Sequence, residues 1–170
     1  MSVIKTSDFA TAPYLIPVNP NQTLDLQNFI DKEQEDRLLE LFGVELYDLF
    51  IADLVADVPT SARFIKVFDS FYEQTGCNNT LIKSDGIKEM LKGFVYYAYL
   101  RQRVTRVDTT GISMVLSENN EPVSAIYHDI TRRYNEAIET FKVIRYYMIN
   151  VDASTYPEFK GVDKQFNHPY

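Results

Sequence analysis

The sequence predicts a mainly α-helical fold: a helical bundle of about five helices built around a long antiparallel helix pair, with extended termini. Three observations predict it. Residues 84–106 and 124–148 carry apolar side chains at steps of three and four, the spacing of one helix face. Glycine and proline residues interrupt this pattern between the two stretches, where we expect a short hairpin or loop. The length of 170 residues and the hydrophobic fraction of 45% are those of one globular domain with its own core.

Residues 1–23 are predicted to form an extended N-terminal arm. Its prolines are Pro13, Pro17 and Pro20, and its apolar anchor is Tyr14, Leu15 and Ile16. Two interpretations stay open for this arm. One is a poorly ordered terminus, and the other is a segment that docks on a neighbouring subunit.

The main helical domain is predicted to span 24–150 and to begin with three shorter helices over 24–42, 44–56 and 62–74. Thr23 can cap the first helix, and Gly43 suits the position just after its end. The second is apolar over more than half its circumference, so we expect it to be either central or buried on two sides. The third directs an apolar face inward, and residues 75–83 form a loop. The predicted inward residues of the third helix are Phe64, Ile65, Phe68, Phe71 and Tyr72.

The first long helix begins at Ser84 or Asp85, whose side chains can cap it, and the second begins near Ser124. The connection over about 109–123 is either a short hairpin or an open loop, because 112–116 is β-prone. It is either a plain connection or a projecting element that touches a partner. Residues 151–170 form a C-terminal arm whose aromatic residues need a surface, on this domain or on another protein.

The net charge of −7 argues against a protein that wraps nucleic acid, since that affinity comes from Lys and Arg on phosphates. The same net charge is compatible with an acidic ring through which DNA passes. No apolar run approaches the ~20 residues that a bilayer span needs, and the first residues lack a secretory signal. We therefore expect a cytoplasmic protein with no membrane partner. Cys77 is the only cysteine, so no internal disulfide can form.

The sequence offers no recognisable catalytic chemistry. His128 and His168 are far apart, and no zinc, phosphate-loop, dinucleotide or nucleophile-elbow motif is present. We expect no catalytic residue, no cofactor and no metal, so the protein is predicted not to be an enzyme. The many carboxylates keep a carboxylate–metal site open as an alternative.

Among the residues themselves, the aromatic side chains give the strongest indication that the protein belongs to an assembly. Twelve tyrosines and eleven phenylalanines exceed what a small core requires, and Tyr96, Tyr97 and Tyr99 are too close in sequence to face one core. Aromatic side chains are enriched at interface centres. The arginines at the end of the first long helix either complement its dipole or meet an acidic neighbour. The candidate interface residues are Tyr14, Leu15, Ile16, Tyr96, Tyr99, Arg101, Arg103, Arg106, Ile112, Met114, Leu116, Tyr156, Phe159, Phe166 and Tyr170.

The order of five short segments resembles a known family. The segments are LELFG (39–43), ELYDLF (45–50), GIKEMLKGFVYY (86–97), TTG (109–111) and YPEF (156–159). In this order the chain resembles the head–tail connector proteins (adaptor or head-completion proteins) of tailed phages, particularly those of Bacteroidetes-type hosts. The resemblance spans most of the chain and consists of helix ends rather than catalytic signatures.

The resemblance implies a virion structural protein and no catalytic residue. It implies a helical adaptor assembled as a homo-oligomeric ring, typically of twelve copies, beneath the portal protein. Residues 111–122 would face the lumen or an adjacent ring component, and the terminal arms would grip the portal, tail or neck proteins, or neighbouring copies. DNA would pass through as non-specific cargo, and the protein would reside in the virion neck, and in the host cytoplasm during assembly.

Two other classes stay open from the residues themselves. One is a helical protein-binding or regulatory module that acts as a dimer. The other is a small enzyme that uses clustered carboxylates to hold a metal ion.

Overall fold

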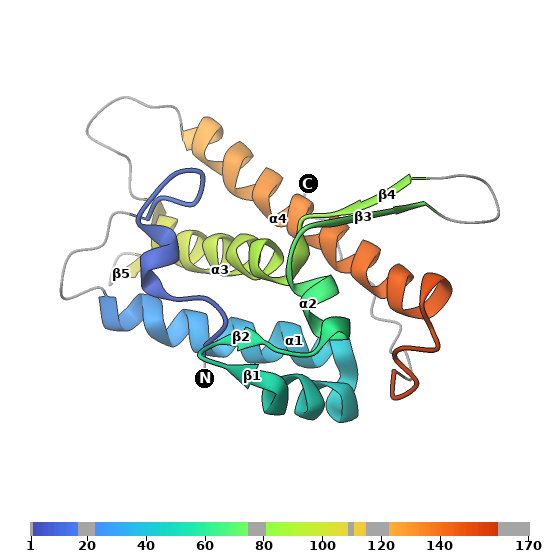
Figure 1. Ribbon diagram of the computed structural model, residues 1–170. Coiled ribbons are helices and arrows are strands. Elements are labelled where there is room, and N and C mark those ends of the chain that lie inside the picture. The colour runs from blue at the N-terminus through green and yellow to red at the C-terminus, as the bar shows by residue number, and fades with distance from the viewer. Residues whose placement is uncertain (1, 17–22, 75–80, 109–110, 115–122, 160–170) are drawn as a thin grey trace.

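The computed structural model describes residues 2–16, 23–74, 81–108, 111–114 and 123–159, with side chains described outside 103–127. The protein is mainly helical, as the sequence predicts (Figure 1). Within these ranges, helices α1, α3 and α4 form the body, and three two-stranded antiparallel hairpins are attached to it. None of the helices in the described ranges has the length and hydrophobicity to cross a membrane.

Helix α1 (Thr23–Asp53) contains both of the first two predicted helices. Gly43 kinks it, with a φ of 72° and a ψ of 170° that interrupt the helical backbone. This conformation lies in the region that favours glycine, so the prediction that Gly43 separates two helical segments is confirmed. The second segment ends at Asp53, three residues before the predicted end, because a tight turn follows. Ala56 and Asp57, the two residues of that turn, both have positive φ values, of 52° and 68°.

This turn joins β1 (Leu54–Val55) to β2 (Val58–Pro59). Asp53 fixes the chain that follows, since its carboxylate accepts hydrogen bonds of 2.9 Å from the backbone N–H groups of Thr60 and Ser61. Burial raises the pKa of Asp53, but these hydrogen bonds outweigh burial and lower the pKa below its ordinary value. Ser61 then leads into α2 (Ala62–Phe68).

The predicted third helix is wrong beyond Phe68. Residues Phe71–Gln74 form β3, which pairs with β4 (Leu81–Ser84), so part of the predicted loop over 75–83 is also a strand. Alternation along β3 buries Phe71 in the core but leaves Tyr72 76% exposed. Ile65 on α2, predicted to point inward, is 41% exposed.

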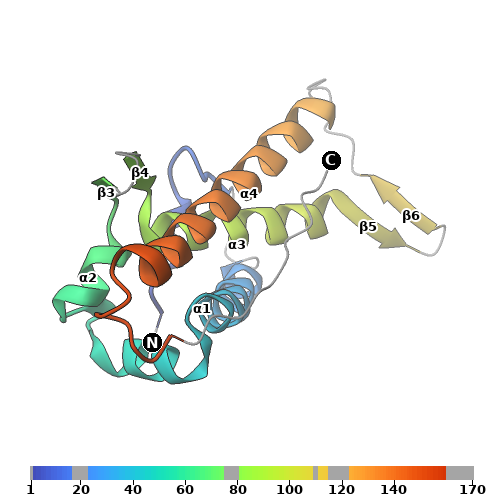
Figure 2. The same ribbon diagram turned by 90° about the vertical axis from the view of Figure 1, so that its right-hand side faces the viewer.

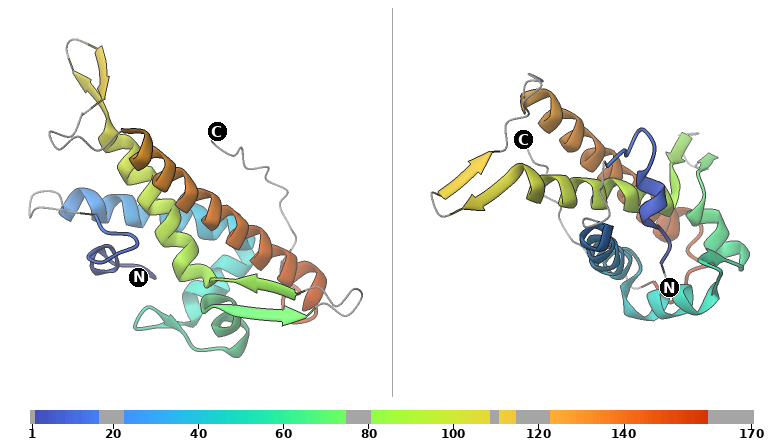
Figure 3. Two further views of the ribbon diagram at one scale, coloured as in Figure 1. Left: turned by 90° about the horizontal axis from the view of Figure 1, so that it is seen from above. Right: turned by 90° about the vertical axis from the view of Figure 1, so that its left-hand side faces the viewer.

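The long antiparallel helix pair is confirmed as α3 (Gly86–Val104) and α4 (Val123–Tyr146), which lie side by side in Figures 1 and 3. Gly86 has a φ of 87°, and a Cβ there would lie 2.5 Å from the carbonyl oxygen of Phe68, so glycine is required at the start of α3. Helix α4 continues into one π-helical turn, Tyr147–Val151.

Strands β5 (Thr105–Asp108) and β6 (Gly111–Met114) form a hairpin that continues directly from α3. The connection was predicted to be either a short hairpin or an open loop, and its described part is a hairpin. It begins earlier than the β-prone segment over 112–116, because Thr105–Asp108 supplies the first strand. Figure 2 shows the hairpin extending beyond the helical body, as a projecting element would.

The core lies between α1, α3 and α4 and extends to α2. Phe42, Phe50 and Phe64 form its aromatic centre, with ring centroids 5.1–6.0 Å apart. All three rings are at most 1% exposed. Burial of each such side chain contributes about 1.5–3 kcal/mol before entropy costs, so this cluster fixes the kinked helix α1 against α2.

Candidate assembly interface

The N-terminal segment over residues 2–16 packs on its own domain. Val3, Ile4 and Phe9 are at most 4% exposed, and Thr6–Phe9 forms a short 3₁₀-helix, η1. The arm was predicted to be either a poorly ordered terminus or a segment that docks on a neighbouring subunit. Its packing on the same domain matches neither interpretation. Residues 17–22, which complete the predicted arm, lie outside the described residues.

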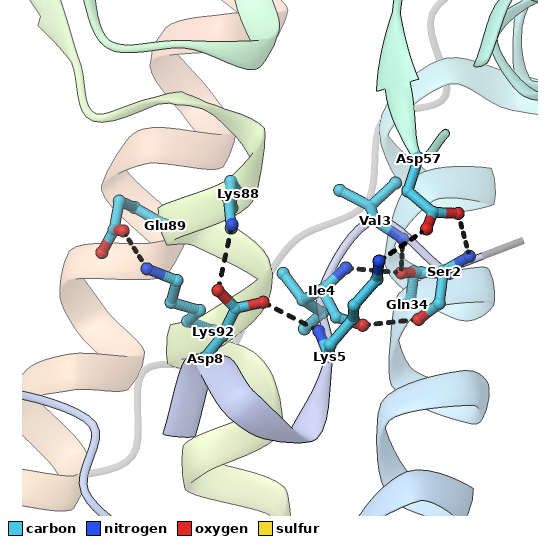
Figure 4. Close-up of polar contacts among 10 residues, drawn as sticks. All are labelled: Ser2, Val3, Ile4, Lys5, Asp8, Gln34, Asp57, Lys88, Glu89 and Lys92. Atoms are coloured by element: carbon cyan, nitrogen blue, oxygen red, sulfur yellow. Dashed lines mark hydrogen bonds and ion pairs between the residues drawn. The ribbon is translucent and has the colours of Figure 1, made fainter. Parts of the chain in front are cut away.

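Gln34 is the centre of the arm's docking site (Figure 4). This side chain of α1 is 6% exposed, and its Oε1 accepts hydrogen bonds from the backbone N–H groups of Val3 (2.6 Å) and Ile4 (3.2 Å). A single buried amide therefore satisfies two buried backbone donors that belong to no helix or strand.

Asp57 in the β1–β2 turn binds the other side of the arm. Its carboxylate accepts a 3.1 Å hydrogen bond from the backbone N–H of Ser2 and pairs with the Lys5 ammonium at 2.9 Å. The Lys5 contact, followed by the Ser2 hydrogen bond, lowers the pKa of Asp57 below its ordinary value. The arm thus joins two elements that are distant in sequence, α1 and the β1–β2 hairpin.

Asp8 connects the arm to α3. It accepts a 2.8 Å hydrogen bond from the backbone N–H of Lys5 and pairs with Lys88 at 3.0 Å (Figure 4). Burial raises the pKa of Asp8, but the hydrogen bonds from Lys5 and Lys88 outweigh it, so the pKa lies below its ordinary value.

The predicted anchor Tyr14–Ile16 alternates between the core and the surface. Tyr14 and Ile16 are 7% and 3% exposed, whereas Leu15 is 53% exposed. The Tyr14 ring meets Tyr96 of α3 edge-on at 5.8 Å. Of the three anchor residues, Leu15 alone offers its side chain to another molecule.

The neighbouring tyrosines of α3 are covered by three different parts of the same chain. Tyr96 meets Tyr14 of the arm, Tyr97 stacks on Tyr134 of α4 at 4.2 Å, and Tyr99 meets Phe29 of α1 at 5.4 Å. The premise that these tyrosines need a second molecule is therefore wrong, because α3 is central and has partners on several sides. Tyr96 and Tyr99 are 9% and 2% exposed and present little surface to a partner.

The candidate residues near the β5–β6 hairpin are only partly described. Arg101 is exposed, and its guanidinium donates a 2.8 Å hydrogen bond to the hydroxyl of Tyr97. For four others the structure describes the backbone but not the side chain: Arg103, Arg106, Ile112 and Met114. Leu116, Phe166 and Tyr170 lie outside the described residues.

The described part of the predicted C-terminal arm, up to Phe159, also packs on its own domain. Tyr156 is 2% exposed, and its hydroxyl donates a 2.6 Å hydrogen bond to the carbonyl oxygen of Arg63 on α2. Glu158 pairs with the Arg63 guanidinium at 3.2 Å. Phe159 is half-buried and lies 5.9 Å from the Arg145 guanidinium. Of the two surfaces considered for this arm, residues 152–159 use their own domain.

Two exposed apolar side chains lie on the β3–β4 hairpin: Tyr72, which was predicted to point inward from a helix, and Leu81, which was predicted to lie in a loop. The register pairs Tyr72 with Lys83 and Gln74 with Leu81, which places the four side chains on one face. Tyr72 is 76% and Leu81 65% exposed. The prediction of a helix over 62–74 placed Tyr72 in the core, whereas the alternation of a strand directs it to the surface.

In the described ranges, no group of three or more His, Cys, Asp or Glu side chains is placed to hold a metal ion. The carboxylate–metal alternative thus has no candidate ligand set there. No protein-family model, curated protein or solved structure matches the chain.

Proposed function

We propose that the chain is a virion structural protein, a head-to-tail adaptor that forms a ring between the portal and the tail of a tailed phage. One observation supports this most: the β5–β6 hairpin continues α3 beyond the helical body (Figure 2). A two-stranded hairpin held away from its own core has free edges that a neighbouring subunit can cover. A rigid helix then sets the distance between the body and that contact.

The charge of the chain supports the same proposal. With a net charge of −7, a ring of identical copies repels the phosphate backbone rather than binding it. DNA then passes as non-specific cargo. The site of action is the virion neck, and the host cytoplasm during assembly.

Co-sedimentation with the portal protein encoded by the same genome tests this proposal. The full chain is expected to co-sediment with assembled portal, while a variant with residues 105–114 replaced by a short Gly-Ser turn stays in solution. A second variant with Gly-Ser in place of 75–80, the residues between β3 and β4 in the sequence, is the matched control for shortening a hairpin. Absence of the unmodified chain from the portal fraction would contradict the proposal.

The dimeric binding module is a second candidate, favoured by the exposed face of the β3–β4 hairpin. Tyr72 and Leu81 form an apolar pair that a second copy can cover. Light scattering across a concentration series distinguishes this candidate. A dimer that Tyr72→Ser dissociates would favour it over the adaptor.

A further inference from the structure

The kink at Gly43 divides α1 into two segments, and the glycine itself does not set the angle between them. Its φ of 72° and ψ of 170° lie in a region of backbone conformation that is essentially restricted to glycine. A Cβ atom there would meet no atom of the described residues within 4 Å, and the next side chain, Val44, is 68% exposed. No described side chain is wedged into the kink, so contacts elsewhere must fix its angle.

The N-terminal arm is attached to the segment of α1 that precedes the kink. The backbone N–H groups of Val3 and Ile4 both donate to the amide oxygen of Gln34 (Figure 4). Gln34 lies nine residues before Gly43, which is about 14 Å along the helix. The three side chains at this attachment are at most 6% exposed, so the contact is shielded from water.

The flanking arm residues, Ser2 and Lys5, are attached on the other side of the kink. The backbone N–H of Ser2 and the ammonium group of Lys5 contact the Asp57 carboxylate at 3.1 Å and 2.9 Å (Figure 4). Asp57 lies in the β1–β2 turn. This hairpin is held to the end of α1, because the carboxylate of Asp53 accepts hydrogen bonds from the chain that follows β2. The position of Asp57 therefore follows that of the second segment of α1.

The four residues Ser2–Lys5, which we call the strap, thus close a triangle. Its first side is α1 from Gln34 to the kink. Its second side is the segment after the kink together with the β1–β2 hairpin, and its third side is the strap. The angle at the kink is fixed once all three sides have a fixed length. Detaching either end of the strap removes this constraint.

The aromatic cluster of Phe42, Phe50 and Phe64 also crosses the kink, but it constrains the angle less than the strap does. Phe42 directly precedes Gly43 and so lies at the pivot, where a rotation displaces atoms least. At Gln34, by contrast, a rotation of about 20° displaces the helix by about 5 Å, which breaks the hydrogen bonds to the strap. The cluster therefore holds the pivot together, and the strap is the contact that responds to the angle.

We propose that the N-terminal arm sets the angle of α1 at Gly43 through the strap, and that release of the strap frees this angle. Residues 44–59 then change their position relative to the first segment of α1. A partner that takes up Ser2–Lys5 therefore alters the shape of the body without contacting α1. The device is independent of the proposed function, because all of its contacts lie within one chain.

Pulsed electron paramagnetic resonance between two nitroxide labels tests the proposal in the full chain. The labels are attached at Lys32→Cys and Ala52→Cys, two exposed positions on opposite sides of the kink, in a Cys77→Ser background. With the strap in place, one narrow distance distribution is expected. Gln34→Leu is expected to broaden it or to shift its maximum by about 3 Å or more, as lever arms of about 17 Å and about 14 Å give for a rotation of about 20°.

Two further variants weaken the strap at its other end. Asp57→Asn and Lys5→Gln each remove the ion pair and keep the contact with Gln34, so both are expected to broaden the distribution less than Gln34→Leu does. Gln27→Leu, the same change on α1 at a position that contacts Asp31 and not the strap, is the matched control and should leave the distribution unaltered.

Circular dichroism establishes that each variant keeps its helices. An unchanged distribution in Gln34→Leu, or equal broadening in Gln27→Leu, would overturn the proposal. If Gln34→Leu loses its helical signal, the two milder variants decide, and unchanged distributions in both of them would overturn it.

Discussion

A Cβ atom on Gly93 of α3 would lie 2.8 Å from the Cβ of Ala137 on α4 and 2.9 Å from the carbonyl oxygen of Arg133. Both distances are shorter than a real Cβ atom tolerates, so the two helices can lie this close only because residue 93 is glycine. The missing side chain at Gly93 therefore sets the separation of the helix pair that carries the β5–β6 hairpin.

Substituting Gly93 with alanine is expected to destabilise the protein by about 1–3 kcal/mol, the cost of forcing extra volume into a packed contact. The loss occurs although alanine favours helices, because the contacted oxygen belongs to the backbone and cannot rotate away. Urea unfolding measures the change. The double variant Gly93→Ala with Ala137→Gly should lose less than the sum of the single losses. If Gly93→Ala had the same free energy of unfolding as the unmodified protein, α3 and α4 would not be in close contact at Gly93.

Gln34→Leu is expected to release the N-terminal arm. The substitution keeps the buried volume but leaves the N–H groups of Val3 and Ile4 without their acceptor, at a cost of about 1–3 kcal/mol. Amide hydrogen exchange of Val3 and Ile4 should accelerate. Gln27→Leu makes the same change on a half-buried position of α1 and is the control, for which exchange of the arm should be unaltered. Slow exchange in Gln34→Leu would disprove the role of this amide.

Asp57 is expected to make the stability of the protein fall in acid. Its pKa is lower in the folded state, so its contribution is complete above the unfolded pKa of about 3.9 and is lost as the pH falls through the folded value. Asp57→Asn should unfold with a shallower pH dependence between about pH 4 and pH 2. Asparagine tolerates the positive φ of this position, so the turn is kept. Asp48→Asn, an exposed change on α1, should retain the normal slope.

Tyr147 is expected to contribute to alkaline unfolding. Burial, followed by the charge of Asp152, raises its pKa to about 12. The folded state thus favours the neutral phenol, and the stability it contributes is complete below the unfolded pKa of about 10 and is lost as the pH rises toward 12. Tyr147→Phe should reduce the loss of stability between these pH values in denaturant titrations. Tyr72→Phe, on an exposed tyrosine, should leave that loss unchanged.

The helix pair and the kink at Gly43 could be predicted from the sequence because each leaves a local signal. Steps of three and four residues mark a helix face, and glycine marks a positive φ. Strand β3 could not be predicted this way, since the four residues Phe71–Gln74 fit a helical and an alternating pattern equally well. The pairing with β4 decided between them.

The candidate interface was harder to predict because it depends on contacts between distant residues. Gln34 gives no local sign that it holds the backbone of residues 3 and 4. Likewise, the tyrosines of α3 look surplus until the arm, α1 and α4 are seen to cover them.

Electron microscopy of the native phage particle is the most direct test of the adaptor proposal. With the chain labelled by a bound antibody fragment, the proposal predicts density for a ring of copies between the portal and the tail, with each β5–β6 hairpin touching a neighbouring copy or an adjacent ring. Particles whose neck contains no copy of this chain, or a chain that remains a monomer in contact with no virion component, would contradict it.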